Sequence, residues 1–525
     1  MVTIHWSLLR NTFHSHYESI KSFFCSFYML TLFFVSFISF IGGTCIYFLE
    51  KDYSQITFLD ALFITVSSST GTGLMTVDIY FLKVSSQFLL SFCTELCGVS
   101  VASCAIPAFL RIYRLSTKCQ KEETEMSFLE HHKKTQNEND SQEELHEQEQ
   151  SEEDVIDVEL ITSEMVPYKY NYQIEMKAIS IFALLCVIYI VVFQCLGFLI
   201  LTLNCNFNSK TREALVNDGV NPTFYSFFVV ISAWNNVGST VSSSSFDVTQ
   251  DYVVMITMTI LCIMGLIGLP LGIRFFVFLV HRLFEPRGLK TISLRNPLLY
   301  ALKSPTRISN FLFSASQTRL LLLIFIILVV LQTTCIVLFN RDESLSDRII
   351  ILALIQSSVT RTSGFTFLDF KKFNDVVSVV LCFTMFVGSY PIQIIRSIRD
   401  QQVNIESGLS PKPSNVKTII SYFKDVFQSH AMIVMVLSLI IMAFYAFDHP
   451  DEHIALTAIF EITSGFGTVG YSLGCSTCDN FSFSGVLPSF AKCVVIFSMI
   501  IGRVRGYPYR LYPPDYYDSS IKKRD

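Results

Sequence analysis

Long apolar runs alternate with polar segments along this chain, and eight of the runs approach the ~20 residues with which a helix crosses a bilayer. They cover residues 23–49, 88–112, 178–203, 252–280, 320–339, 376–395, 431–447 and 486–501. The runs form four pairs, and within each pair lies a shorter apolar segment that ends in glycine and hydroxyl residues. This pattern predicts an all-α polytopic membrane protein with eight spanning helices, built from four repeats of helix, pore loop and helix.

The four short segments share one order: an apolar helix, a serine near its end, and a glycine four to six residues later. They read FLDALFITVSSSTGTGLMTVD at 58–78, FFVVISAWNNVGS at 227–239, ALIQSSVTRTSGFTFLD at 353–369 and FEITSGFGTVGYSLG at 460–474. A loop at membrane depth is tolerated only where it is shielded from lipid, for example along a water-filled path. Ion filters lined by backbone carbonyls are built in this way.

Four glycines in these loops are candidates for an ion filter: Gly73, Gly238, Gly364 and Gly470. A filter turns carbonyls toward an axis where four segments meet, and glycine allows both the unusual backbone angles and the close approach. Any one such glycine would more often serve a turn or helix packing, whereas four in register favour a filter. The short helix before each glycine directs its partly negative C-terminus at the centre, which favours a cation.

Composition supports a membrane protein, because 51% of the 525 residues are hydrophobic and only 16% are charged. Soluble domains contain about 25% charged residues. Most of the 15 cysteines stand singly in apolar runs and are interpreted as small core residues. The exception is Cys475-Ser-Thr-Cys478, which can form a short disulfide in an oxidising compartment. A metal site there would lack a companion pair, so no metal is expected beyond a transported cation.

Basic residues gather between the pairs of runs and predict the orientation. Residues 282–319 hold seven Lys or Arg against one acid, and residues 396–424 hold five against two. By the positive-inside rule these segments and the basic tail face the cytoplasm, so the pore loops face outward, as does the sequon at Asn480. The expected organisation is repeats at 1–112, 177–281, 320–397 and 429–502, linkers at 113–176, 282–319 and 398–428, and a cytoplasmic tail at 503–525.

The first linker differs from the others, because residues 121–164 contain 16 acids and three Lys in a tract rich in Glu, Gln, Asn and Ser. Such a tract buries too little apolar surface to fold, so we predict that it is disordered and cytoplasmic. It is interpreted either as a solvated spacer or as a binding site for regulators.

Five motifs together resemble the Trk/Ktr/HKT superfamily of potassium and sodium transporters, in particular its eukaryotic Trk members. They are TGTGL at 70–74, SAWNNVG at 232–238, TRTSGF at 360–365, FEITSGFGTVGYSLG at 460–474 and IIGRVRGYP at 500–508. The resemblance covers nearly the whole membrane part. It implies one central pore made by four repeats of one chain, a homodimer, a plasma-membrane location and passage of potassium. It implies filter residues at Thr70, Gly71, Thr72, Gly73, Asn236, Val237, Gly238, Thr362, Ser363, Gly364, Thr468, Val469 and Gly470.

Two positions distinguish this chain within the resemblance. Members with serine at the first filter glycine tend toward sodium, whereas Gly73 occupies that position here and favours potassium. Tyr471 stands where many relatives have Leu or Phe. The sixth apolar run also contains FVGSYP at 386–391, which is shorter than the gating loop of bacterial relatives. Gly388 and Pro391 can break the helix there as part of a gate, or form an ordinary proline kink.

Charged residues in the apolar runs are the remaining candidates. In the family, the arginine that matches Arg503 faces the permeation path below the filter, so Arg503 is a gate candidate; the alternative is a positive-inside anchor shared with Arg505. Lys492 is expected to support the filter by pairing with a carboxylate or carbonyls, or else to extend to the membrane interface. A location at that interface would equally explain Asp60, Glu95 and Glu461.

Together these features predict potassium uptake across a membrane. The alternative is a sodium-selective transporter, or one coupled to sodium or protons, of the same fold. A membrane enzyme would need a zinc motif such as HExxH, facing aspartates, or a serine with a histidine base, and the spanning runs carry none of these. We therefore expect no enzyme activity, no nucleic-acid partner, and no cofactor beyond transported K⁺, Na⁺ or H⁺.

Overall fold

Helices supply the regular structure in the part of the chain that the structure describes. The computed structural model describes residues 27–54, 56–102, 106–113, 115–117, 120, 124, 152–242, 251–283, 289–309, 311–339, 348–368, 374–387, 416–448, 454–474 and 481–505. These residues form α, 3-10 and π helices and contain no strand. The predicted all-α class is therefore confirmed.

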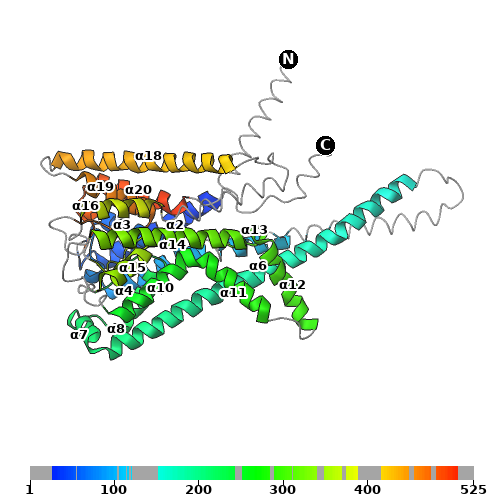
Figure 1. The fold of residues 1–525 in the computed structure, drawn as a ribbon, viewed down its shortest axis with the longest axis horizontal. Helices are drawn as coiled ribbons and strands as arrows, with labels where there is room; N and C mark the ends of the chain where they lie inside the picture. Colours follow the sequence, from blue (N-terminus) through cyan, green and yellow to red (C-terminus); the bar gives the residue numbers. More distant parts are fainter. Residues whose placement is uncertain are drawn as a thin grey trace, which may run out of the picture. The chain divides into compact units, whose positions relative to one another are not determined.

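Each predicted repeat contains a short pore helix between two membrane helices (Figure 1). The first has α2 (Phe27–Glu50), pore helix α3 (Phe58–Thr70) and α4 (Val84–Cys97). The second has α6 (Glu152–Phe207), α7 (Ser209–Asn217), pore helix α8 (Pro222–Trp234), α10 (Tyr252–Cys262), the π-helical turn η3 (Ile263–Ile267) and α11 (Gly268–Leu283). The third has α14 (Ala315–Leu338), pore helix α15 (Ile349–Val359) and α16 (Asp375–Val387). The fourth has α18 (Val416–Asp448), pore helix α19 (Ala455–Gly467) and α20 (Ser489–Val504).

Local sequence explains where two of the pore helices begin. The N-cap Thr57 of α3 accepts a hydrogen bond from the Asp60 backbone N–H at 3.1 Å, and its hydroxyl donates to the Asp60 carboxylate at 2.6 Å. The Thr57 hydroxyl thus caps the N-terminus of α3 and is itself fixed by the Asp60 carboxylate. Helix α8 begins with the N-cap Asn221 followed by Pro222, whose fixed φ suits the first helical position. Both short helices therefore have encoded starting points.

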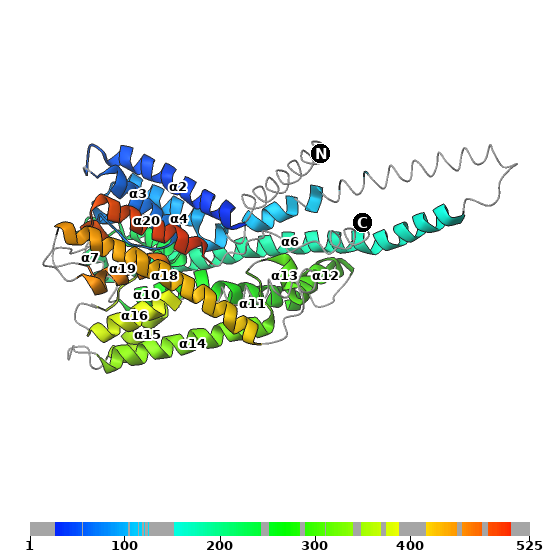
Figure 2. The same ribbon diagram turned by 90° about the horizontal axis from the view of Figure 1, so that it is seen from above.

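The four repeats close into a ring through their pore helices. Each pore helix packs against the second membrane helix of the preceding repeat: α8 on α4, α15 on α10, α19 on α16, and α3 on α20. Figure 2 shows α3 beside α20, and α14 beside α15 and α16. The chain thus surrounds a single centre with four pore helices.

Two compact units divide the chain, and all four pore helices belong to the first. Unit 1 comprises Met1–Ser103, Tyr189–Gly272 and Ala315–Asp525, and unit 2 comprises Cys104–Ile188 and Ile273–Ser314. Within unit 2, α12 (Leu289–Lys303) packs on α13 (Pro305–Ile308). A buried ion pair joins Arg111 and Glu175 in the same unit. The pore helices and the loops after them can therefore be described entirely within unit 1.

Five described helices are long and apolar enough to cross a membrane: Met29–Glu50, Gln173–Phe207, Tyr252–Leu283, Ala315–Leu338 and Gln428–Ala446. The other three predicted spans are shorter in the described residues, where α4 has 14 residues, α16 has 13 and α20 has 16. Helix α4 ends because Gly98 leaves the helical conformation, at φ −54° and ψ 152°. The count of eight spanning helices stays a prediction.

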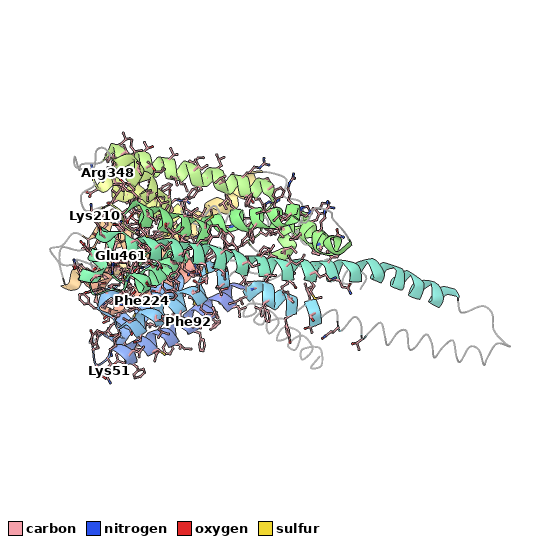
Figure 3. All side chains as sticks on the ribbon, turned by 90° about the horizontal axis from the view of Figure 1, so that it is seen from below. Lys51, Phe92, Lys210, Phe224, Arg348 and Glu461 are labelled. Carbon is pink, nitrogen blue, oxygen red and sulfur yellow. The ribbon has the colours of Figure 1, made fainter. Side chains whose placement is uncertain are left out.

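Large apolar side chains cover the outward faces of the membrane helices. Phe37 on α2 is 63% exposed, Phe92 on α4 is 60% exposed, and Ile327 on α14 is 56% exposed. Figure 3 shows Phe92 among the side chains along one flank of the helices. Contiguous exposed apolar surface on this scale is unfavourable in water but matches a lipid environment. This agrees with a multi-pass membrane protein.

The predicted disorder of linker 113–176 is wrong at its C-terminal end. Helix α6 begins at Glu152, so the last part of the acidic tract is helical and continues into the third apolar run. Extending an existing helix adds one hydrogen bond per residue fixed, whereas starting a new one is costly. A segment that would not fold alone can therefore be helical when it directly precedes a stable membrane helix. Residues 125–151 of the linker lie outside the described part.

Candidate functional site

Three pore helices end in the same backbone conformation. Positive φ angles occur at Gly71 and Gly73 after α3, at Asn236 and Gly238 after α8, and at Thr468 and Gly470 after α19. Each pair consists of a left-handed residue, one intervening residue, and a glycine with φ between 88° and 95°. Glycine adopts such angles at little cost, which explains its place at the second position. The predicted filter segments of repeats one, two and four therefore share one geometry.

Serine hydroxyls hold these turns against their pore helices. The backbone N–H of Gly73 donates to Ser67 Oγ at 3.0 Å, and that of Gly470 donates to Ser464 Oγ at the same distance. In the second repeat, the Ser239 N–H donates to Ser232 Oγ at 3.0 Å. Because the serine lies on the last turns of each helix, it fixes the glycine peptide to a rigid element. The serines noted in the sequence pattern are thus part of the site.

The four predicted filter glycines meet one another in a closed ring. A Cβ on Gly73 would lie 1.8 Å from the Val237 carbonyl oxygen, and one on Gly470 would lie 1.9 Å from the Thr72 oxygen. A Cβ on Gly238 would lie 2.3 Å from the Gly364 nitrogen, and one on Gly364 would lie 3.1 Å from the Gly470 oxygen. Segments one, two, three and four are therefore each in contact with the next, and the fourth contacts the first.

The third segment follows a different design. Within residues 359–368, all of which are described, no residue has a positive φ. Gln356 of α15 takes the role of the serine: its Oε1 accepts from the N–H groups of Phe367 at 2.7 Å and Leu368 at 3.2 Å. Its Nε2 donates to the Phe365 carbonyl at 3.1 Å. The Tyr471 hydroxyl, from the fourth repeat, donates to the same carbonyl.

Lys492 supports a pore helix rather than a filter turn. Its Nζ lies 2.8 Å from Asp60 Oδ1, and both side chains are mostly buried. Asp60 stands ten residues before Thr70 on α3, which is about 15 Å along the helix. This ion pair is the kind of contact that was expected for Lys492, namely a pair with a carboxylate. The pair joins α20 of the fourth repeat to the start of the first pore helix.

Two other acidic residues lie inside the bundle. Glu461 on α19 has 0% exposure and accepts hydrogen bonds from the backbone N–H of Ser484 at 2.9 Å and from its hydroxyl (Figure 3). Glu95 on α4 accepts from Asn235 Nδ2 at 2.7 Å and from Gln194 Nε2 at 2.9 Å. Because Asn235 caps α8, Glu95 ties the first repeat to the second pore helix. Both carboxylates therefore bind groups of other repeats or loops within the protein, and their depth relative to the membrane interface stays a prediction.

Three arginines lie close to the deep ends of the pore helices. Arg503 donates from Nη2 to the Cys97 carbonyl at 2.5 Å, and its Nη1 would lie 3.7 Å from a Cβ on Gly71. Arg505 is 7% exposed, lies over the Phe466 ring and donates to the Gly467 carbonyl at 3.3 Å. A cation is favourable at that helix C-terminus, so Arg505 stabilises the end of α19. Its function as a positive-inside anchor stays a prediction.

The third arginine belongs to the third filter segment itself. Arg361 is 2% exposed, and its guanidinium lies 4.4 Å from the centre of the Phe325 ring. Its Nε and Nη2 have no hydrogen-bond partner in the described part of the chain. A buried cation in a membrane protein is costly and commonly functional. Sequence reasoning passed over Arg361, although its position directly before Thr362 was a usable signal.

Several predicted residues lie outside the described part of the chain. The gate candidates Gly388 and Pro391 are among them, as are Cys475, Cys478 and the sequon Asn480. The helical gate, the disulfide and the glycosylation site therefore stay predictions. Sequence reasoning also missed Gln356 and noted Tyr471 only as a departure, because their contact joins two segments that lie far apart in the sequence.

Comparison with known proteins supplies the family. The TrkH family, described as cation transport proteins, matches residues 160–513. Potassium transporter TRK1 of Candida albicans is 27% identical over 363 residues, covering 64% of this chain and 33% of the relative. The low-affinity potassium transport protein of Saccharomyces cerevisiae is 26% identical over 392 residues, covering 64% and 43%. Potassium transport protein 1 of Schizosaccharomyces pombe is 24% identical over 352 residues, covering 64% and 41%.

This chain thus spans less than half the length of these three relatives. Among solved structures, the potassium transporter TrkH from Vibrio parahaemolyticus matches with a TM-score of 0.47 and 16% identity, over 91% of this chain and 82% of that one. The family match extends over more than half of the 525 residues. The chain therefore belongs to the TrkH family of cation transport proteins.

Proposed function

We propose that this protein takes up potassium ions across a membrane through a filter formed by its four pore-loop segments. The observation that carries the proposal is the closed ring of Gly73, Gly238, Gly364 and Gly470 at the ends of four pore helices. Backbone oxygens of Thr72, Val237 and Val469 lie at the contacts of that ring. Carbonyl oxygens in such a ring can replace the hydration shell of an ion.

The pore helices add an electrostatic preference for cations. The C-terminal ends of α3, α8, α15 and α19 all lead directly into the ring. Each end carries about half an elementary negative charge, so the four together stabilise a positive ion at the centre. Gly73 supports potassium over sodium, because relatives with serine at that position tend toward sodium.

Rubidium uptake in cells that lack their own potassium uptake tests the proposal. Cells that produce the protein should accumulate radioactive Rb⁺, and a Gly470→Ala variant at matched surface amounts should not. Uptake of ²²Na⁺ that exceeds Rb⁺ uptake would replace potassium by the sodium-selective alternative. Dependence of Rb⁺ uptake on external Na⁺ or on pH would identify a coupled ion. Absence of both fluxes would contradict cation transport.

A homodimer is proposed on the basis of the family resemblance, with one pore in each subunit. Native mass spectrometry of the detergent-solubilised protein should give twice the mass of one chain, 59.7 kDa. A single-chain mass that persists in lipid nanodiscs would contradict the dimer and leave the pore within one chain unaffected.

A further inference from the structure

The junction between the third and fourth filter segments is held by a pair of polar side chains from different repeats. Gln356 comes from pore helix α15, and Tyr471 follows the filter glycine Gly470 of the fourth repeat. Gln356 is 0% exposed and Tyr471 is 3% exposed. The Gln356 Nε2 donates to the Tyr471 hydroxyl oxygen, and that hydroxyl donates to the Phe365 carbonyl. The two side chains therefore converge on one buried backbone oxygen.

That oxygen belongs to the residue directly after Gly364, so its position fixes the end of the third segment. Gln356 also binds the backbone N–H groups of Phe367 and Leu368, which follow in the same loop. Residues 359–368 of this segment have no positive φ, and Gln356 takes the place of the serine that binds the loop in the other three segments. The geometry of the third segment consequently depends on hydrogen bonds from Gln356 of its own pore helix and from Tyr471 of the fourth repeat.

The equivalent position in the first repeat shows a different kind of contact. Leu74 follows Gly73 as Tyr471 follows Gly470, and Leu74 is 0% exposed. It packs in the apolar cluster of the fourth repeat, near Gly465. An apolar contact of this kind can slide without loss of a specific partner, whereas a hydrogen bond has a defined length and direction. The polar junction therefore fixes the spacing of two segments more tightly than an apolar one.

We propose that the Gln356–Tyr471 pair is a selectivity determinant that sets the distance between the third and fourth filter segments. The inference rests on the proposed potassium function. With the pair intact, the carbonyls around Gly364 and Gly470 are held at a fixed separation. Without it, the third segment can move inward and coordinate the smaller Na⁺ ion. Both residues act by positioning backbone atoms.

Reversal potentials under voltage clamp, with K⁺ and Na⁺ varied one at a time, test the pair through Tyr471→Phe and Gln356→Met. A buried hydrogen bond contributes about 1 kcal/mol, so Tyr471→Phe should lower the K⁺-to-Na⁺ permeability ratio about fivefold. Gln356→Met also removes the bonds to Phe367 and Leu368, so it should lower the ratio by at least that factor. The double variant should lose no more than Gln356→Met alone, because both changes break one unit. Tyr445→Phe is the matched control: Tyr445 is 4% exposed and its ring packs on Phe483, which is not a filter residue.

The outcomes distinguish a failure of the Gln356–Tyr471 proposal from a failure of the proposed potassium transport. A wild-type reversal potential that does not change with the K⁺ concentration would refute potassium conduction. A potassium-selective wild type with unchanged permeability ratios in both variants would overturn the pair as a selectivity determinant. So would two losses that simply add in the double variant. Loss of surface protein in both variants but not in Tyr445→Phe would assign the pair to folding and equally overturn the proposal.

Discussion

At Gly73, Gly238 and Gly470 the backbone leaves no space for a side chain. All three residues have positive φ, and a Cβ on any of them would lie within 2.3 Å of a backbone atom in the next segment. Left-handed backbone alone costs an ordinary residue about 1–2 kcal/mol, and a clash with backbone cannot be relieved by a rotamer change. Gly364 differs, because its φ is ordinary and its nearest contact would be 3.1 Å.

Alanine substitutions should therefore fall into two classes. We expect Gly73→Ala, Gly238→Ala and Gly470→Ala to lower Rb⁺ uptake by much more than tenfold at matched surface amounts, because backbone of the neighbouring segment must move to admit each Cβ. Gly364→Ala should retain uptake within about tenfold of wild type, since small shifts of the Gly470 carbonyl cost about 1 kcal/mol. Equal losses at all four positions would contradict this ranking.

Gly73→Ser should lower the preference for potassium over sodium, because the Val237 carbonyl must move away to admit the new side chain. Changes at Gly73 and Gly470 should be of similar severity, since both glycines have similar φ and nearly equal clearances. An unchanged Na⁺-to-K⁺ permeability ratio in Gly73→Ser would remove Gly73 from the filter.

Residues with a local pattern could be predicted from the sequence, whereas those defined by distant contacts could not. The filter glycines follow from four repeats of helix, serine and glycine. Gln356 and Tyr471 meet across 115 positions of sequence, and either could equally be a packing residue when read alone. The contact of Arg505 with the Gly467 carbonyl could not be predicted for the same reason. The position of Arg505 at the end of the last apolar run indicates only a membrane anchor.

Asp251 gives a prediction on pH at the single-residue scale. It precedes the span that starts at Tyr252, and its Oδ2 accepts hydrogen bonds from Asn204, Asn208 and Thr211. Burial alone would raise the pKa of Asp251, but these bonds and one from the Val253 N–H outweigh it, so the pKa lies below its ordinary value. A lowered folded-state pKa stabilises the protein above the unfolded pKa of about 3.9, and this is lost as pH falls further.

Thermal unfolding of the purified protein between pH 3 and 7 measures that contribution. Asp251→Asn should be less stable than wild type at neutral pH, and the difference should shrink as the pH falls below about 4. Asp52→Asn is the comparison, because Asp52 is an exposed carboxylate and its removal should leave stability close to wild type across this range. A difference between Asp251→Asn and wild type that is constant across this range would contradict the assignment.

At the scale of elements, the Lys492–Asp60 pair holds the first pore helix against the last membrane helix. Removing one partner of a buried ion pair leaves the other charge without compensation, which costs about 3–5 kcal/mol. Lys492→Met should therefore lower the thermal unfolding midpoint and the amount of protein at the surface. Adding Asp60→Asn to Lys492→Met should recover part of the loss, because the uncompensated carboxylate is gone.

Lys51→Met provides the control for that experiment. Lys51 is an exposed residue at the end of α2, and Figure 3 shows it at the periphery. Removing a solvated lysine costs less than about 1 kcal/mol. If Lys51→Met and Lys492→Met lowered the unfolding midpoint equally, the ion pair would have no special role in holding α3.

At this scale the sequence predicts helices better than their ends. The apolar runs locate α2 and α14 well, and they locate the C-terminal end of α18. Helix α18 begins at Val416, so the expected linker 398–428 is wrong at its C-terminal end. Run 88–112 was expected to be one span, but it is interrupted at Gly98, and residues 99–102 and 106–113 are helical again. Only glycine fits at the interruption, because a Cβ there would lie 1.9 Å from Asn235 Oδ1. That close approach is a tertiary demand on the glycine. The helical start of α6 at Glu152 was missed for the opposite reason, since composition favours disorder and a preformed membrane helix overrides it.

For the whole molecule, the acidic linker should be dispensable for the pore. Deletion of residues 122–150 stops short of α6 and should leave surface amounts and Rb⁺ uptake largely unchanged. A deletion that extends to residue 159 removes the start of that helix and is the less conservative test. A protease applied from outside intact cells should not cut the linker. Cleavage there would overturn the cytoplasmic orientation, and loss of the inserted protein would contradict dispensability.

Electrostatics over the whole filter combines attraction with repulsion. Four pore-helix C-termini favour a cation at the ring, while the Arg503 guanidinium lies near Gly71 of the first segment and Arg505 contacts the Gly467 carbonyl at the end of α19. Binding must be strong enough for entry and weak enough for exit. A set of fixed positive charges beneath the ring can supply the second condition.

Arg503 is the member of that set for which we predict a gate function. Its guanidinium is held by the Cys97 carbonyl and lies near Gly71, so it stands directly beneath the first filter segment. A unit charge about 10 Å from a passing ion opposes it by about 1–2 kcal/mol at an effective dielectric constant of 20, which corresponds to about tenfold in rate. Arg503→Gln should therefore raise the rate of potassium entry by up to that factor.

The control for the gate must be a basic residue at a helix end that does not touch the ring. Arg282 fits, because it is exposed and lies in the last turn of α11. Arg505→Gln cannot serve, since Arg505 contacts Gly467 at the base of the fourth segment and its loss should also alter entry. Initial Rb⁺ uptake at matched surface amounts should rise in Arg503→Gln and stay at the wild-type rate in Arg282→Gln. Equal, small effects of these two substitutions would mean that the Arg503 charge does not act on the permeating ion and that Arg503 serves as a membrane anchor.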